Sequence, residues 1–286
     1  MKEALYWEKA AGTAAPAVHC LLCPHDCKIA DGATGICGVR RNSGGRLHSI
    51  IYGETTSVAL DPIEKKPLYH YHPGEYILSL GTKGCNFKCP FCQNWAISQD
   101  DGAPTEKITP EWAVAKAKEL KSFGIAYTYN EPFIWYEFVL DTAKLAKKAG
   151  LENVLVTNGY VNPGPLAEIL PLIGAMNIDL KSIDDGFYRK YCKGSLGPVL
   201  STIKTSAKSC HIEITNLVIT GLNDTDADFK KLSGWICDNA GPETPLHFSR
   251  YFPCYRMDLP ITPKETLERA RGIAREKLEN VYLGNI

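Results

Sequence analysis

The sequence lacks the features that direct a protein to a membrane or to nucleic acid. Its 286 residues include 32 basic and 32 acidic side chains, so no net charge favours nucleic acid or an anionic lipid surface. No apolar run approaches the roughly 20 residues of a membrane-spanning helix. The first ten residues include Lys2, Glu3, Glu8 and Lys9 and lack the apolar stretch of a secretory signal. We therefore expect a cytoplasmic protein that binds neither membrane nor nucleic acid.

Cysteine, by contrast, is abundant. The chain has 11 cysteines, and in a reducing compartment such a number indicates metal binding or catalysis rather than disulfides. Seven of them fall into two tight groups before residue 93. The other four are scattered and are expected to be ordinary buried or half-buried thiols: Cys192, Cys210, Cys237 and Cys254.

Cys85, Cys89 and Cys92 form the more informative group, with the spacing CxxxCxxC. A [4Fe–4S] cluster has four irons and normally takes four thiolates. Three closely spaced cysteines can bind three of the irons and leave the fourth open, which is typical of a catalytic metal site. A structural zinc site would need a fourth Cys or His, and none follows nearby. The spacing therefore predicts an iron–sulfur cluster with one open iron.

Cys20, Cys23, Cys27 and Cys37 form the other group, with four thiols inside 18 residues. A closed Cys₄ zinc site would stabilise a small lobe that has little apolar core of its own. A second [4Fe–4S] cluster, acting as an electron relay, fits the same four ligands. The sequence predicts a metal site here and leaves zinc and iron–sulfur open.

The composition and the hydrophobic pattern of the chain change near residue 75. Residues 1–75 are rich in Gly, Cys and His, have a first helical stretch at Glu3–Lys9, and end in the Pro-punctuated run Asp61–Leu68. We expect a Cys-rich metal-binding lobe and linker in residues 1–75, and a core barrel in residues 76–286. Within the linker, Tyr69–His72 is interpreted as a packing segment rather than a metal site.

Short apolar runs alternate with helical patterns after residue 75, which is typical of a parallel sheet. Because the glycine fingerprint of a dinucleotide-binding open sheet is missing, six or seven such repeats favour an α/β barrel or partial barrel. The expected strands are Tyr76–Leu80, Ile125–Tyr129, Val154–Val156, Ala175–Leu180, His211–Ile219, Leu246–Phe248 and Val281–Leu283. The expected helices are Thr109–Phe123, with Thr109 as N-cap, Pro132–Ala149, Pro165–Leu172, Asp224–Asn239 and Thr262–Leu278, with Thr262 as N-cap.

Polar residues follow several of these strands, at the end of the barrel where chemistry is built in such folds. They occur in the motifs Asn130-Glu131-Pro132, Thr157-Asn158-Gly159 and Asp179-Leu180-Lys181, and His247 lies in the sixth strand. His211 and Glu213 alternate along the fifth strand, and the sequence leaves open whether they point into the barrel.

These motifs resemble the radical S-adenosylmethionine (SAM) superfamily. The CxxxCxxC loop after the first barrel strand and the three strand-end motifs are similar to the pyruvate formate-lyase activating enzymes, over about residues 75 to 286. The stretches CLLCPHDC, GICGVR, DPIEKKPLYH, GTKGCNFKCPFCQNW and VYLGN are similar to the radical SAM enzymes of the AmmeMemoRadiSam system. The resemblance implies a partial (β/α)₆ TIM-like radical SAM barrel with a small Cys-rich N-terminal lobe.

The resemblance also implies a function. SAM would bind the open iron, and one electron from the reduced cluster would give methionine and a 5′-deoxyadenosyl radical that abstracts hydrogen from a substrate. By analogy with the activating enzymes, the expected substrate is a protein or peptide. The implied electron donor is a low-potential flavodoxin or ferredoxin. The alternatives are radical modification of a small molecule, or a non-catalytic metal-binding assembly or sensor protein.

Four site residues follow from the resemblance by position at two strand ends. Glu131 and the backbone near Asn130 match the place where the family holds the SAM amino group. Thr157 and Asn158 match contacts to the methionine carboxylate and the ribose.

The remaining site residues are assigned in the same way. Asp179 and Lys181 match an Asp-x-Lys motif that borders SAM and the substrate, and His247 resembles a family His near the methionine moiety. Phe91 would shield the cluster edge or pack on the adenine. Val156 stands where the activating enzymes have an Asp of a monovalent-cation site, so no cation site is expected here.

Overall fold

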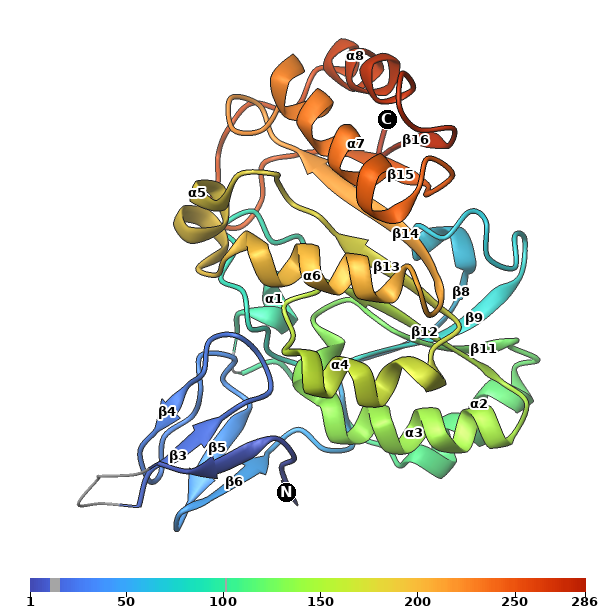
Figure 1. Ribbon diagram of the computed structural model, residues 1–286. Helices are drawn as coiled ribbons and strands as arrows, with labels where there is room; N and C mark the ends of the chain where they lie inside the picture. The colour runs from blue at the N-terminus through green and yellow to red at the C-terminus, as the bar shows by residue number, and fades with distance from the viewer. Residues whose placement is uncertain (11–15, 101) are drawn as a thin grey trace.

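A computed structural model describes residues 1–10, 16–100 and 102–286 (Figure 1). Its centre is an eight-stranded sheet with the order β16-β15-β14-β13-β12-β11-β9-β8, in which β8 alone runs antiparallel to its neighbour. Because β8 and β16 are the two edges, the sheet is an open partial barrel, as the sequence predicts. The strands are β8 Ser57–Pro62, β9 Tyr76–Gly81, β11 Gly124–Tyr127, β12 Glu152–Thr157, β13 Ala175–Asp179, β14 His211–Val218, β15 Leu246–Arg250 and β16 Val281–Gly284.

Helices cover the outer face of the sheet (Figure 1). Parallel neighbours need a long crossover, which these helices supply. Two pairs pack side by side, α2 against α3 and α7 against α8. The main helices are α2 Pro110–Glu119, α3 Tyr136–Lys148, α4 Pro163–Ile169, α6 Leu196–Ser206, α7 Asp226–Ala240 and α8 Lys264–Ala274.

The expected strands are all confirmed, with ends that differ by at most two residues. The Thr109 cap is also confirmed, because its hydroxyl accepts a hydrogen bond from the Trp112 backbone N–H at 3.1 Å. Thr262 does not cap α8; its hydroxyl instead donates to the Val218 carbonyl at 2.6 Å. The sequence analysis missed α6, whose Gly, Pro and β-branched residues weaken helix propensity. Burial of Val199 and Ile203 against the sheet overrides that propensity.

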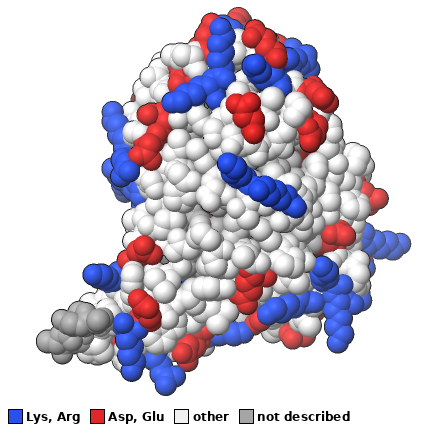
Figure 2. Space-filling view, in the orientation of Figure 1, with Lys and Arg blue, Asp and Glu red and all other residues white. Residues whose placement is uncertain are grey.

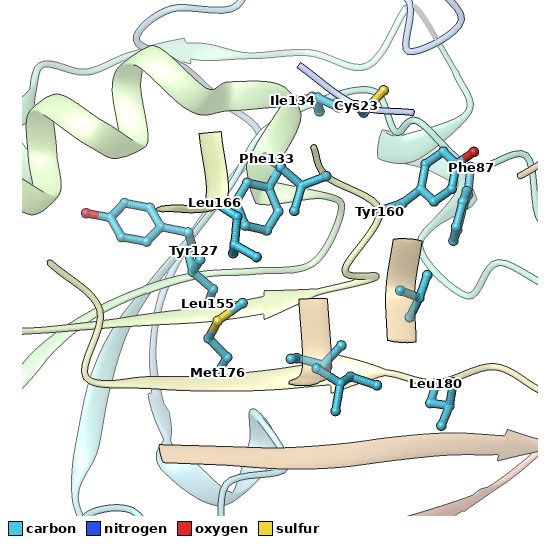
Figure 3. Close-up of a cluster of buried hydrophobic side chains, with 14 of the residues drawn as sticks. Cys23, Phe87, Tyr127, Phe133, Ile134, Leu155, Tyr160, Leu166, Met176 and Leu180 are labelled. Atoms are coloured by element: carbon cyan, nitrogen blue, oxygen red, sulfur yellow. The ribbon is translucent and has the colours of Figure 1, made fainter. Parts of the chain in front are cut away.

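Alternation along the strands separates an apolar outer face from a more polar inner face. Leu155 and Met176, from adjacent strands, belong to the same buried cluster as Leu166 of α4 and Tyr127 of β11. Figure 3 shows these side chains together between the sheet and the helices. The inner face is therefore free to carry the polar residues of a site.

The segment expected to be a linker is part of the barrel instead. Ser57–Pro62 forms β8, and a 3₁₀ turn at Ile63–Lys65 follows it. Ile63 and Leu68 are fully buried in a small second core with Ile77 of β9. This segment, residues 57–72, is called the strap below. The strap closes the amino-terminal end of the inner face. Sequence alone did not reveal its strand, because the apolar residues that alternate along it, Val58 and Leu60, lie on the exposed face.

The N-terminal lobe consists of two small antiparallel sheets, β1-β6-β5 and β2-β3-β4. The prediction of a helical stretch at Glu3–Lys9 is wrong, because this segment contributes to two strands. Tyr6, which lies between the strands, has a φ of +55° and turns the backbone there. The strands are β1 Lys2–Glu3, β2 Trp7–Lys9, β3 Val18–Cys20, β4 Lys28–Ile29, β5 Arg40–Ser43 and β6 Arg46–Ser49. A further pair, β7 Glu54–Thr55 with β10 Glu106–Lys107, lies beside the barrel.

A buried ion pair joins the lobe to the barrel. The Arg40 guanidinium donates to the Glu137 carboxylate of α3 at 3.0 Å, and both side chains are 1% exposed. The same carboxylate accepts the Leu5 backbone N–H at 2.8 Å. Asn162, before α4, donates its backbone N–H to the Leu22 carbonyl at 3.1 Å. The Cys-rich lobe is thus fixed against the side of the barrel that carries the Cys85 loop.

Candidate functional site

A cavity of about 190 Å³ lies at the carboxyl ends of the barrel strands. Residues that follow β9, β11, β12 and β13 line it, together with inward-facing residues of β14 and β15. The predicted site residues that line this cavity are Cys85, Phe91, Cys89, Cys92, Asn130, Asn158, Asp179 and Lys181. Parallel strands therefore bring together residues that are far apart in the sequence, at the edge where barrels build their active sites.

The cysteine loop follows β9 and ends at α1 Trp95–Ser98. Backbone hydrogen bonds fix it near its start and in its middle, from Gly84 N to the Ile97 carbonyl at 2.8 Å and from Lys88 N to the Cys192 carbonyl at 2.9 Å. Gly84 has a φ of +88°, and an added Cβ would lie 2.7 Å from a backbone oxygen, so only glycine fits there. The loop geometry thus holds all three thiols on one wall of the cavity.

The thiols of this loop have environments that suit cluster ligands. Cys85 Sγ accepts hydrogen bonds from Phe87 N at 3.4 Å and from Asn158 Nδ2 at 3.8 Å, and such donors tune iron–sulfur clusters. Burial and the charge of Glu131 raise the pKa of Cys85 well above its usual value. Burial also raises the pKa of Cys92. The free thiols are therefore protonated, and binding iron would release their protons.

Within residues 1–10, 16–100 and 102–286, no three His, Cys, Asp or Glu side chains are arranged around a single metal ion. Ligands of a [4Fe–4S] cluster bind different irons and do not need to converge on one point. No Cys beyond Cys85, Cys89 and Cys92, and no His, lines the described part of the cavity. The donor set fits a cluster that keeps one iron without a protein ligand.

Cys192, which the sequence analysis interpreted as an ordinary buried thiol, lies beside this loop. It is fully buried at the end of a short π-helix, Tyr188–Cys192. A hydrogen bond with the Cys192 thiol, together with burial, raises the pKa of Cys89 well above its usual value. Cys192 does not line the cavity. It therefore contacts a predicted ligand from outside the site.

Glu131 and Thr157 lie behind the cavity wall, not in it. The Glu131 carboxylate, 1% exposed, accepts hydrogen bonds from Phe133 N at 3.0 Å, Thr157 Oγ1 at 2.7 Å and Asn158 N at 2.8 Å. Burial raises the pKa of Glu131 to about 7, against the opposing effect of these three donors. Glu131 thus ties the end of β11 to the end of β12 and fixes the position of Asn158.

Asn130 and Asn158 hold the cavity wall together. Asn130 Nδ2 donates to the Gly84 carbonyl at 2.8 Å, and its Oδ1 accepts the Thr82 N–H at 3.2 Å. Asn158 Nδ2 donates to Asn86 Oδ1 at 2.8 Å. Both side-chain amides therefore connect a neighbouring strand end to the cysteine loop.

Asp179 and Lys181 form an ion pair of 3.0 Å at the end of β13. Burial lowers the pKa of Lys181, but Asp179 and the nearby Cys89 outweigh it, so the pKa lies well above its usual value. Lys181 is therefore a fixed positive charge that faces the cysteine loop. Phe91 lines the same cavity and packs against Phe187, with ring centroids 5.9 Å apart.

His247 lies deeper in the barrel than the resemblance implies and does not line the cavity. Its Nε2 is 2.6 Å from Glu213 Oε2, and Glu213 Oε1 accepts the His70 backbone N–H of the strap at 2.7 Å. His211 Nε2 lies 3.0 Å from the same carboxylate. Burial raises the pKa of Glu213, but the hydrogen bonds lower it to about 2. His211 and Glu213 do point into the barrel, where they join the strap to the sheet. Within the strap, Tyr69 packs edge-on against His247.

Several cavity residues were missed by sequence reasoning. Thr215 of β14 and Ser249 of β15 line the cavity two residues beyond inward-facing Glu213 and His247. The period of two along a strand is the signal that could have identified them. Tyr129, with a φ of +72°, also lines the cavity, and strained backbone of this kind occurs at functional sites.

The four thiols of the lobe lie close together. Burial, together with the neighbouring Cys37, Cys20 and Cys27, raises the pKa of Cys23 to about 12. His25, between them in sequence, lies 2.7 Å through its Nε2 from the Asn86 carbonyl of the cysteine loop. The lobe thiols therefore lie near the Cys85 loop, although their side chains are not arranged around one ion.

Comparison with known proteins identifies the fold and the family. The chain is 45% identical over 291 residues to the uncharacterized protein MJ0808 of Methanocaldococcus jannaschii, across 100% of this chain and 86% of the relative. It is 25% identical over 214 residues to the pyruvate formate-lyase 1-activating enzyme of Escherichia coli K12, across 68% of this chain and 86% of the relative. Streptococcus suis SuiB bound to S-adenosylmethionine has the same fold, with a TM-score of 0.57 at 11% identity over 73% of this chain and 52% of SuiB.

No helix in the described part of the chain is long and apolar enough to cross a membrane. The Radical SAM superfamily model matches residues 79–236, which is more than half of the chain and includes the cysteine loop and the strand ends that line the cavity. The activating enzymes among its relatives indicate that the protein is an enzyme. The chain therefore belongs to the radical SAM superfamily.

Proposed function

We propose that this protein cleaves SAM reductively and uses the resulting 5′-deoxyadenosyl radical to abstract hydrogen from a protein or peptide substrate. The observation that carries the proposal is the set of three thiols on one cavity wall, with no other Cys or His among the described lining residues. Cys85, Cys89 and Cys92 would hold a [4Fe–4S] cluster, which supplies one low-potential electron to SAM at its open iron.

The chain's own residues would bind and orient SAM. Asn130, Asn158, Asp179 and Lys181 place amide, carboxylate and ammonium groups on the cavity wall, suited to the amino, carboxylate and ribose groups of SAM. Phe91 offers an apolar surface to the cluster edge or the adenine. We assign Glu131 and Thr157 a positioning role through Asn158, since both lie behind it. His247 lies beneath the cavity on the inner face of the barrel, so any effect of His247 on SAM would be indirect.

The substrate class rests on the relatives. Three sets of relatives at 25% identity are named as activating enzymes, for pyruvate formate-lyase, for (2S)-3-sulfopropanediol dehydratase and, putatively in its printed name, for a glycyl-radical enzyme. Exposed Trp95 and Phe252 follow the cysteine loop and β15, and they would give a partner chain apolar side chains to contact. These observations support a protein substrate over a small molecule. A low-potential flavodoxin or ferredoxin would supply the electrons.

We further propose that Cys20, Cys23, Cys27 and Cys37 bind zinc or a second [4Fe–4S] cluster that stabilises the lobe. Their proximity and the small apolar core of the lobe support this assignment. The same cysteine stretches support placing the chain with the radical SAM enzymes of the AmmeMemoRadiSam system. Eleven free cysteines support a cytoplasmic location.

One anaerobic experiment tests the central proposal. The purified protein is analysed for iron, zinc and sulfide, then incubated with SAM and dithionite while 5′-deoxyadenosine is measured. We expect turnover that Cys89→Ala abolishes. A reconstituted cluster that never cleaves SAM would instead favour a metal-binding assembly or sensor protein. Electron paramagnetic resonance of mixtures with candidate glycyl-radical enzymes then tests the substrate class, and radical transfer to small molecules alone would contradict it.

A further inference from the structure

A second cavity lies on the outer side of the cysteine loop and shares one lining residue, Gln99, with the proposed active site. Its volume is about 510 Å³, and four cationic side chains line it: Lys88, Lys190, Lys193 and Arg256. None of the described residues that line it is acidic, and none of the four cations takes part in an ion pair in the described part of the chain. We call this cavity the basic groove.

Aromatic rings hold two of these cations in place. The Arg256 guanidinium lies 4.9 Å from the Tyr255 ring centroid, and the Lys190 ammonium lies 5.0 Å from that of Tyr191. Tyr255 in turn stacks on Trp95 of α1, with centroids 5.3 Å apart. Figure 2 shows Lys and Arg side chains gathered at the left edge of the molecule, beside the place of α5 Asp185–Phe187 in Figure 1. The groove is therefore a positively charged surface in which tyrosine rings contact two of the cations.

The floor of the basic groove is the cysteine loop itself. Lys88 and Pro90 line the groove and flank Cys89, a predicted cluster ligand. The Arg256 backbone N–H donates to the Pro90 carbonyl at 2.9 Å, and Lys88 N donates to the Cys192 carbonyl at 2.9 Å. The two residues on either side of a predicted cluster ligand therefore belong to a charged outer surface.

We propose that the basic groove docks an acidic one-electron carrier protein, which reduces the cluster through the Cys89 segment. The inference rests on the proposed function and names its electron-transfer face. One electron passes from the carrier, which is oxidised, to the cluster, which is reduced, and no bond or proton moves. Electron transfer slows steeply with distance, so a carrier gains most by docking where the cluster loop forms the surface. Opposite charges on the two faces speed and orient the encounter.

The test separates a protein donor from a chemical one. The variant is Lys190→Gln with Lys193→Asn, since Asn tolerates the φ of +61° at residue 193 and both side chains are exposed. The control is Lys230→Gln with Lys231→Gln on α7. It also removes two exposed positive charges, but neither residue lines the groove. The probes are an acidic flavodoxin, reduced before mixing, and dithionite, which needs no docking surface.

With flavodoxin we expect the KM for the carrier to rise about fivefold or more in the groove variant and its salt dependence to weaken. Cleavage of SAM driven by dithionite stays unchanged, and the control matches the wild type with both donors. An unchanged carrier KM, or an equal loss with dithionite, would overturn the docking proposal. A rise in the KM of a protein substrate alone would show that the groove binds substrate instead.

Direct binding keeps the proposal testable without turnover. Titration of labelled flavodoxin at low and high salt measures affinity for the reconstituted wild type and both variants. If the groove variant binds flavodoxin more weakly and the control variant binds it as the wild type does, the proposal is supported. Equal binding to all three proteins contradicts it. A wild type that binds flavodoxin in the groove and does not cleave SAM with dithionite would refute the proposed function while leaving the docking surface intact.

Discussion

The Tyr129 hydroxyl donates a 2.6 Å hydrogen bond to the Asp61 carboxylate, which joins the cavity wall to the strap. Lys66 donates to the same carboxylate oxygen at 2.7 Å, and its ammonium lies 4.5 Å from the Tyr129 ring centroid. The Lys66 side chain is 2% exposed and the Asp61 side chain 13% exposed. A buried ion pair is therefore part of the support beneath the proposed SAM site.

Asp61→Asn should destabilise the protein by about 3 to 5 kcal/mol, because it leaves the Lys66 ammonium buried without a counter-charge. Adding Lys66→Met should recover much of that loss, since the buried charge is then gone. Urea denaturation at pH 7 measures the free energy of unfolding of each variant. If the effects of Asp61→Asn and Lys66→Met simply add, the two side chains are not coupled as the structure indicates.

Acid stability should depend on Glu213. In the folded protein the pKa of Glu213 is about 2, below its ordinary value of 4.5. Its contribution to the free energy of unfolding is therefore complete above pH 4.5 and disappears as the pH falls towards 2. The shift corresponds to about 3 kcal/mol for this fully buried carboxylate. Glu213→Gln should therefore lower the free energy of unfolding by about that amount at pH 7 and hardly at all near pH 2.

Unfolding curves at a series of pH values measure this difference. Glu265→Gln on α8 is the matched control, because Glu265 is exposed. A Glu213→Gln protein that keeps the wild-type pH profile would show that the hydrogen bonds from the strap and from His247 do not hold the carboxylate ionised.

The sequence predicted the parts of this site that depend on local pattern. Apolar runs such as Tyr76–Leu80 located the strands, and parallel pairing then placed Asn130, Asn158 and Asp179 at one edge. The sequence did not predict contacts between distant segments. The alternation along β8 does not indicate which distant residue Asp61 contacts, so its hydrogen bond with Tyr129, 68 residues away, could not be foreseen.

The sequence also did not predict how deep in the barrel a side chain lies. His247 and Ser249 share one face of β15, but only Ser249 lines the cavity. Sequence spacing assigns a side chain to a face and says little about its height along the barrel axis. Glu131 illustrates the same limit, because its motif places it at a strand end while its carboxylate turns back to the backbone of Asn158.

Cys192 should be dispensable for the cluster. It contacts Cys89 from outside the cavity, so Cys192→Ser should retain about four irons per chain at the Cys85 loop and should still cleave SAM. Cys89→Ser should lose both properties. Iron and sulfide analysis with electron paramagnetic resonance of the reduced protein measures the outcome. Loss of the cluster in Cys192→Ser would identify a fourth ligand, and the proposed open iron would then not exist.

Gly84 should be the most sensitive glycine at the contact between the lobe and the barrel. Its φ is +88°, and a Cβ would lie 2.7 Å from the Cys37 carbonyl oxygen and 2.7 Å from Val39 Cγ1. Gly84→Ala therefore combines backbone strain with overpacking, and we expect a loss of about 2 to 4 kcal/mol. Because Gly84 precedes Cys85, iron content after reconstitution should fall as well.

Gly74 supplies the control that separates these two causes. Its φ of +80° is nearly the same, but a Cβ there would meet no atom within 4 Å. Gly74→Ala should cost only the backbone strain, about 1 kcal/mol, and should leave iron binding unchanged. Equal losses in the two variants would mean that strain alone matters and that the lobe does not press on the cysteine loop. A larger loss for Gly84→Ala, with less iron bound, would show that lobe packing shapes the cluster site.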